Sequence, residues 1–236
     1  MNYPGPLRRG RLIRRYKRFL ADVVCDDGES LTAHCPNTGS MLGCTTEGAG
    51  VWLSHSDRPG RKYPWTWEQV TADGGARVGI HTGRTNDVVE EAIRAGWFPE
   101  LGEPAAVRRE VSVPDEHMRA DFRLADRAGS MTYVEAKNVT AAVDDRVALF
   151  PDAVSRRGTR HLEVLQRLAE TGTAAVLVFC VQRTDVDEVR PADGIDPEYG
   201  RALRSAIAAG VGAYALVAEP SDTAIEPRAR VPVVCP

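Results

Sequence analysis

The alternation of apolar and polar residues divides the 236-residue chain into two parts. Residues 10–83 hold short apolar segments broken by Gly, Asp and Asn turns, such as "LTAHC" at 31–35 and "VWLSHS" at 51–56, and show no long helical pattern. Several strands at this spacing predict a small closed or partly open barrel of the OB type. We therefore expect residues 1–84 to form an OB-like β-barrel domain.

The pattern of residues 85–236 predicts a separate α/β domain. Asn86 can cap a helix over 87–95, and Gly96 suits its C-terminal stop. The remaining predicted elements are, in order, strands at 106–113, 119–125 and 132–140, a helix at 155–172, a strand at 174–182, a helix at 197–210 and a strand at 211–219. The nearly continuous apolar run at 174–182 is typical of a central strand covered on both faces.

Three charged residues in the second part have a spacing that points to chemistry. Glu135 and Lys137 are two residues apart on one predicted strand and share a face, and Asp121 can stand beside them on the neighbouring strand. Grouped carboxylates suit Mg²⁺ or Mn²⁺, and the Lys can orient or deprotonate an attacking water or neutralise a phosphate. The triple predicts a metal-dependent phosphodiester hydrolase, with an exposed cross-strand ion-pair network as the alternative.

The net charge of −3 gives no sign of an acidic partner, but the basic residues are unevenly distributed. Seven of them precede the first acidic residue, Asp22; they are Arg8, Arg9, Arg11, Arg14, Arg15, Lys17 and Arg18. Such a local positive field attracts phosphates whatever the total charge, although an ordinary solvated strand face is an equal alternative. Arg61 and Lys62 lie beside Tyr63, Trp65 and Trp67, a mixture suited to phosphate contact and base stacking, with core packing as the favoured role of the two tryptophans.

Composition excludes other classes of protein. The five cysteines are an odd number without a CxxC pair, so neither a disulfide framework nor a four-cysteine zinc site is indicated. No apolar stretch reaches the roughly 18 residues that cross a bilayer, and the basic N-terminus lacks a signal-peptide pattern. We expect a cytoplasmic protein without membrane association.

Two further segments have a functional and a structural interpretation. The loop "CPNTGSM" at 35–41 can present backbone N–H groups to a phosphate or contact the other domain, and as a plain turn it would need no function; Cys35 is expected to be a buried thiol. Arg157 and His161 lie one turn apart near a helix start, where an anion is favoured. We expect Arg157 to touch a phosphate and His161 to position it or a water, with a surface Arg and a half-buried His as the alternative.

The order of helix, three strands, helix and strand resembles the PD-(D/E)xK nuclease superfamily, with its Asp on the second strand and its ExK on the third. The chain also resembles the sugar fermentation stimulation protein A (SfsA) family. The stretches that carry this resemblance are "RYKRFLADV" at 15–23, "HCPNTGSMLGC" at 34–44, "RKYPWTWE" at 61–68, "EEAI" at 90–93, "ADF" at 120–122, "YVEAKNVT" at 133–140 and "FPDAVSRRGTRHL" at 150–162. The resemblance implies an OB-like domain joined to a nuclease-like domain, DNA binding and a part in bacterial sugar metabolism.

Carried over by position, the family pattern implies that Glu91 is the acidic helix residue beside Asp121, Glu135 and Lys137. Our first hypothesis is a DNA-binding protein that holds Mg²⁺ or Mn²⁺ through Asp121, Glu135 and the carbonyl of Ala136, with Glu91 in support. The second is a non-catalytic DNA-binding regulator that keeps the nuclease fold as a scaffold. A third alternative is an RNA-processing role, with RNA as the partner.

Overall fold

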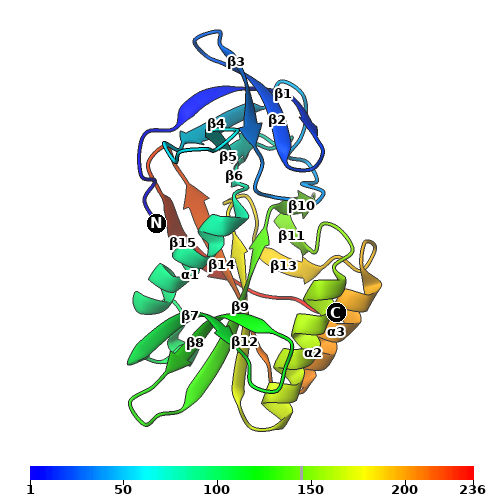
Figure 1. The fold of residues 1–236 in the computed structure, drawn as a ribbon. Coiled ribbons are helices and arrows are strands. Elements are labelled where there is room, and N and C mark those ends of the chain that lie inside the picture. Colours follow the sequence, from blue (N-terminus) through cyan, green and yellow to red (C-terminus); the bar gives the residue numbers. More distant parts are fainter. Residues whose placement is uncertain (144–145) are drawn as a thin grey trace.

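The N-terminal part of the computed structural model, which describes residues 1–143 and 146–236, is a β-barrel (Figure 1). Its strands are β1 (Arg8–Tyr16), β2 (Leu20–Cys25), β3 (Ser30–His34), β4 (Gly50–His55), β5 (Trp65–Thr71) and β6 (Arg77–Gly79). They run in the order β3-β2-β1-β4-β5-β6, and an extra pairing of β3 with β5, at His34 and Thr66, closes the barrel. Trp67 is fully buried in the barrel core and Trp65 is partly buried, so the expected packing role is confirmed for Trp67. The predicted OB-type barrel is confirmed.

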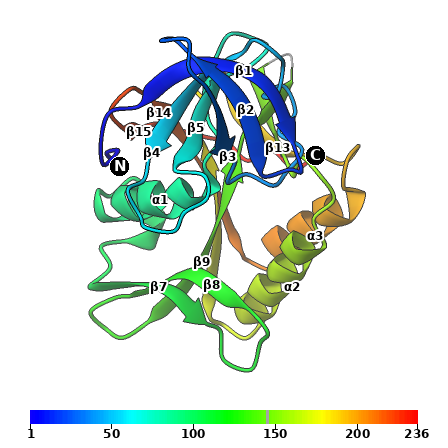
Figure 2. The same cartoon turned by 45° about the horizontal axis from the view of Figure 1, so that its top comes forward.

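The second part is built on a mixed sheet with helices on both faces (Figure 2). Its strands are β7 (Ala106–Ser112), β8 (Arg119–Ala125), β9 (Met131–Val139), β12 (Ala174–Val181), β14 (Gly212–Pro220) and β15 (Ile225–Val231). The order is β15-β14-β12-β9-β8-β7, with β9, β12 and β14 parallel and the outer pairings antiparallel. This confirms the predicted α/β class, in which the run at 174–182 supplies the central strand.

Alternate residues of β12 pack against different helices, which explains its continuous apolar sequence. Val176 and Val178 belong to the core under α1 (Thr85–Arg94), whereas Leu177 and Phe179 belong to the core under α2 (Arg156–Glu170) and α3 (Pro197–Ala208). Both cores also include residues of β9. The sheet is therefore a rigid support for side chains at the barrel end of β9.

Several elements differ from the prediction. The apolar pattern does not single out the short strands β10 (Ala141–Val143), β11 (Val147–Phe150) and β13 (Glu188–Pro191), which form a separate small sheet, or the polar edge strand β15. Two 3₁₀ turns, η1 (Thr82–Arg84) and η2 (Pro99–Leu101), flank α1. The expected capping role of Asn86 is wrong, because α1 already begins at Thr85 with Arg84 in the cap position and no side-chain cap. Gly96 follows the end of α1 with φ of 75°, as predicted for a helix stop.

The two parts are joined through buried polar contacts. Glu68 of β5 is fully buried and accepts hydrogen bonds from Arg84 at 2.7 Å and from Ser54 at 2.7 Å, with His81 Nδ1 at 2.9 Å. η1 runs directly into α1. The domain boundary expected at residue 84 therefore falls in a short connection that the hydrogen bond from Arg84 to Glu68 holds to the barrel. Met1 and Tyr3, in contrast, pack in the core of the second part beneath α1. No helix in the described ranges is long and apolar enough to cross a membrane.

Candidate functional site

The site begins where β8 and β9 separate. Their pairing runs from Ala125 with Met131 to Phe122 with Val134 and stops before Asp121. The carboxylate of Asp121 takes the place of the missing strand partner, since its Oδ2 accepts a hydrogen bond from the Ala136 N–H at 2.8 Å. The N–H and C=O of one strand residue point to the same edge, so the carbonyl of Ala136 also lies on the edge that faces β8. A carboxylate and a backbone carbonyl thus share the opening between the strands.

Glu135 lies on the opposite face of β9 from Ala136 and is almost completely buried. Its Oε1 accepts hydrogen bonds from Lys137 Nζ at 2.5 Å and His161 Nδ1 at 2.6 Å. Its Oε2 is also buried, and it has no hydrogen-bond partner among the described residues. A buried carboxylate oxygen without a donor is unfavourable unless something else, such as a cation, satisfies it.

A chain of hydrogen bonds holds Glu135 from the side of α2. Arg157 Nε donates to His161 Nε2 at 3.3 Å, which leaves that nitrogen without a proton. With Nε2 as the acceptor from Arg157, Nδ1 carries a proton and donates it to Glu135. Arg157 and His161 therefore form a support for Glu135 in this structure, and the contact with a phosphate expected of them stays a prediction.

The two carboxylates have different pKa values because their surroundings differ. Burial, and after it the negative charge of Glu135, raises the pKa of Asp121 to about 6. Burial also opposes the charge of Glu135, but Lys137 and His161 outweigh it and lower the pKa of Glu135 below its ordinary value. Glu135 is ionised at neutral pH and repels the charge of Asp121. A divalent cation between them would relieve that repulsion.

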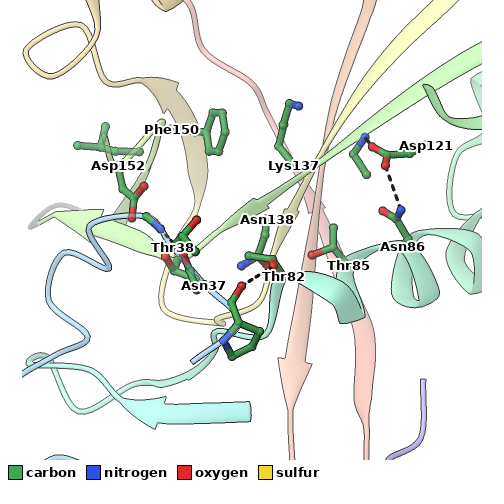
Figure 3. Close-up of a pocket in the computed structure, with 15 residues that line it drawn as sticks. Asn37, Thr38, Thr82, Thr85, Asn86, Asp121, Lys137, Asn138, Phe150 and Asp152 are labelled. Carbon is green, nitrogen blue, oxygen red and sulfur yellow. Dashed lines mark hydrogen bonds between the residues drawn. The ribbon is translucent and has the colours of Figure 1, made fainter. Parts of the chain in front are cut away.

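Asp121, Ala136 and Lys137 line a cleft of about 330 Å³ between the two parts of the molecule (Figure 3). The barrel contributes the loop 36–39 and the second part contributes Phe150 and Asp152. Asp152 accepts hydrogen bonds from the Met41 N–H at 2.8 Å and, through its carbonyl, from Ser40 Oγ at 2.5 Å. The interdomain contact expected of the segment "CPNTGSM" is thus confirmed, and Cys35 within it is a fully buried thiol whose pKa is raised by burial.

The basic residues near the N-terminus have more structural partners than the sequence indicates. Arg15 donates to the carbonyls of Arg18, Asn37, Gly39 and Ser40, and Arg18 donates to the carbonyl of Thr38. Hydrogen bonds from a charged donor are stronger than those between neutral groups. These two guanidinium groups therefore hold the loop 36–39, which we call the cleft loop, in place. Their role is therefore different from that of side chains on a solvated strand face.

The other candidates for phosphate contact lie on the barrel surface. Arg14 pairs with Asp22 at 2.9 Å and lies 5.0 Å from the centre of the Tyr16 ring, and Lys17 is in the turn after β1, with φ of 49°. Arg61 donates to Thr66 Oγ1 at 2.5 Å, and Lys62 lies 5.4 Å from the centre of the Tyr63 ring. None of these four lines the cleft.

The structure does not bring Glu91 into the cleft. Its carboxylate is paired with the amino group of Met1, on the side of α1 where the chain begins, and its side chain is 58% exposed. Asn86 instead is the α1 residue beside Asp121, donating to Oδ1 at 3.0 Å (Figure 3). Glu91 is five positions after Asn86, well away from it around the helix axis. The sequence indicated Asn86 only as a helix cap, and an acidic residue was the expected partner.

In the described ranges, no three His, Cys, Asp or Glu side chains are grouped so as to hold a metal ion alone. Asp121, Glu135 and the carbonyl of Ala136 form a smaller set, and Mg²⁺ is usually bound in this way, through one or two carboxylates together with water and phosphate oxygens. The donor set therefore fits a hard divalent ion that also contacts a substrate.

Comparison with known proteins places both parts in one family. Residues 13–80 match the model of the SfsA N-terminal OB domain, and residues 83–224 match that of the sugar fermentation stimulation protein RE domain. Sugar fermentation stimulation protein homologs of Alkalilimnicola ehrlichii and Halorhodospira halophila are each 57% identical, over 100% and 99% of this chain and 100% and 98% of theirs. A solved structure of Pyrococcus furiosus SfsA in complex with Ca²⁺ matches with a TM-score of 0.86 and 26% identity, over 99% of this chain and 98% of that chain. The chain belongs to the sugar fermentation stimulation protein family.

Proposed function

We propose that this protein is a metal-dependent phosphodiesterase that binds and cuts DNA, with its hydrolytic site at Asp121, Glu135 and Lys137. The observation that carries the proposal is the buried Oε2 of Glu135, which lacks a partner among the described residues and lies beside an Asp121 whose pKa is raised to about 6. A purely structural ion-pair network would satisfy its buried oxygens within the network. Here one oxygen is left for a further group.

Asp121, Glu135 and the carbonyl of Ala136 are the residues that would hold Mg²⁺ or Mn²⁺. When bound, such an ion stabilises negative charge on the phosphate and lowers the pKa of a coordinated water. Pyrococcus furiosus SfsA was solved in complex with Ca²⁺, another hard divalent ion, which supports divalent-cation binding by this chain. Asn86 keeps Asp121 in position through its hydrogen bond to Oδ1.

Lys137 and the cleft determine how a phosphodiester would be handled. The ammonium of Lys137 is fixed by Glu135 and lies at the cleft surface, where it can orient a water for in-line attack and neutralise a phosphate oxygen. Arg157 at the start of α2, and Arg14, Lys17, Arg61 and Lys62 on the barrel, supply positive charge that steers nucleic acid toward the protein. Arg15 and Arg18 act indirectly in this proposal, by holding the cleft loop.

The test is cleavage of labelled single-stranded DNA, duplex DNA and RNA by the full chain with Mn²⁺ or Mg²⁺ and with EDTA. We expect metal-dependent cleavage of DNA that Lys137→Ala and Glu135→Gln abolish and that Glu198→Gln, an exposed substitution on α3, leaves unchanged. Calorimetry with Mn²⁺ should show binding to the wild type and weakened binding to Glu135→Gln. DNA binding without cleavage of any substrate would favour a regulator, and cleavage that survives Lys137→Ala would contradict the assigned site.

A further inference from the structure

A second hollow, of about 490 Å³, shares no lining residue with the cleft, and its lining includes His161, which contacts Glu135. One wall is the end of the β7–β8 connection with the first residue of β8, and the other wall is α2 (Figure 2). We call this hollow the β8–α2 groove. Its lining residues are Glu116, His117, Met118, Arg119, Arg157, Arg160, His161, Glu163, Val164 and Arg167.

The spacing of residues on α2 places a strip of three arginines along one wall, with the buried Val164 between Arg160 and Arg167. Arg157, Arg160, Val164 and Arg167 follow one another at intervals of three or four residues and so share a helix face. Ten residues of helix extend about 15 Å. A strip of that length can follow several successive phosphates of one strand.

The charges of the groove do not cancel. Arg167 is neutralised across the groove by Glu116, with hydrogen bonds of 2.6 and 2.8 Å. Arg119 and Arg160 are exposed. Arg119 donates to the carbonyl of Glu110 at 2.8 Å and forms an exposed ion pair with the Glu110 carboxylate at 3.5 Å. Among the described residues, the ion pairs of α2 are those of His161 and Arg167, and Arg160 is not in one. Glu163 is the remaining acid of the lining, so positive charge is in excess.

The groove lies next to the proposed hydrolytic site. His161 lines the groove and donates to Glu135. On the other wall, Arg119 precedes Asp121 by two residues on the same strand. A chain of phosphates that has one linkage at Asp121 and Lys137 would therefore continue between Arg119 and Arg160.

We propose that the β8–α2 groove binds the phosphodiester backbone of the nucleic-acid strand whose scissile linkage is in the site, with Arg119 and Arg160 as phosphate contacts. This inference rests on the proposed function. An acidic peptide would also be attracted by the excess positive charge. The nearness of the groove to the carboxylates and Lys137, through His161 and Arg119, favours a polymer of phosphates, because only that ligand also uses the site.

The experiment measures binding of fluorescein-labelled oligonucleotides to the full chain in EDTA, by fluorescence anisotropy over a range of salt concentrations. The probes are single-stranded DNA, duplex DNA and single-stranded RNA of equal length. We expect Arg119→Ala with Arg160→Ala to weaken binding on the order of tenfold or more at low salt. The slope of log K against log salt should flatten by about 1.4 for single strands and about 1.8 for duplex, as expected for two lost phosphate contacts.

The control is Arg201→Ala, an exposed arginine of α3 outside the groove. A second double variant, Arg119→Lys with Arg160→Lys, keeps both charges and should recover most of the affinity, which separates a charge effect from misfolding. The proposal is overturned if the alanine double variant binds like the Arg201→Ala control, or if a polyglutamate peptide binds the groove and the oligonucleotides do not. The binding assay contains no metal, so its result does not depend on cleavage. If the groove variant loses binding and the wild type cuts no substrate in the cleavage assay, the groove proposal is kept and the hydrolase proposal is rejected. If the wild type cuts DNA and the groove variant binds as well as the wild type, the hydrolase proposal is kept and the groove proposal is rejected.

Discussion

His161 Nδ1 lies 2.6 Å from Glu135 Oε1. A residue of α2 thus holds the carboxylate of a β9 residue that is 26 positions earlier in the sequence. Lys137 Nζ approaches the same oxygen. Two donors on Oε1 fix the rotation of the carboxylate and leave Oε2 as the oxygen that can accept another ligand. In the proposed metal site, residues that orient a ligand in this way would affect metal affinity without touching the ion.

Replacing His161 with Ala removes one of the donors that hold Glu135. We expect the affinity for Mn²⁺ to fall by about 10–100-fold, the usual cost of losing such a supporting residue. Asn places an amide donor near the position of Nδ1, so His161→Asn should recover part of the affinity. Calorimetric titration of the three proteins checks this, and equal affinities would show that His161 does not support a metal ligand.

Asp121→Asn should stabilise the metal-free protein at neutral pH while abolishing cleavage. The pKa of Asp121 is raised from 3.8 to about 6, so the folded state binds more protons between these pH values and its free energy of unfolding falls as pH rises through them. At pH 8 the substitution should raise the free energy of unfolding by about 1–3 kcal/mol, and below pH 4 by much less. Urea unfolding in EDTA at both pH values measures the difference. A variant that is less stable than wild type at pH 8 would contradict the raised pKa.

Glu68→Gln should destabilise the connection between the barrel and α1. Burial alone would raise the pKa of Glu68, but hydrogen bonds from His81 and Arg84 lower it to about 2. The ionised form therefore stabilises the fold above about pH 4.5, and this contribution is lost as pH falls toward 2. Breaking a buried pair of this kind costs about 3–5 kcal/mol at neutral pH. Thermal unfolding from pH 7 to pH 3 should show a large difference at pH 7 that narrows with acid; a constant difference would exclude this role of the charge.

Gly39→Ala should disturb the contact between the cleft loop and Asp152. A methyl group on Gly39 would lie 2.7 and 2.9 Å from the two carboxylate oxygens of Asp152, and moving that side chain breaks its hydrogen bond to Met41. We expect a loss of about 1–3 kcal/mol in stability, typical of overpacking, together with slower cleavage. Gly74→Ala is the matched control, because its added carbon has open space. If both variants unfold at the same temperature, Gly39 is not constrained by Asp152.

Local geometry accounts for what was predictable from the sequence. Side chains two apart on a strand share a face whatever surrounds the strand, so the pairing of Glu135 with Lys137 followed from their spacing. The same holds for the barrel and α/β patterns and for the central strand at 174–182, which depend on the short-range order of apolar and polar residues.

The tertiary structure decided which residues from distant segments meet. Asn86 rather than Glu91 reaches Asp121, because the rotation of α1 about its axis is set by packing on the sheet and not by its sequence alone. Arg15 holds the cleft loop because the closed barrel places its guanidinium among four carbonyl groups. The sequence by itself determined the two domain types and the charged pair on β9. The partners of that pair across the fold depended on long-range packing, for which the linear spacing of residues carries no signal.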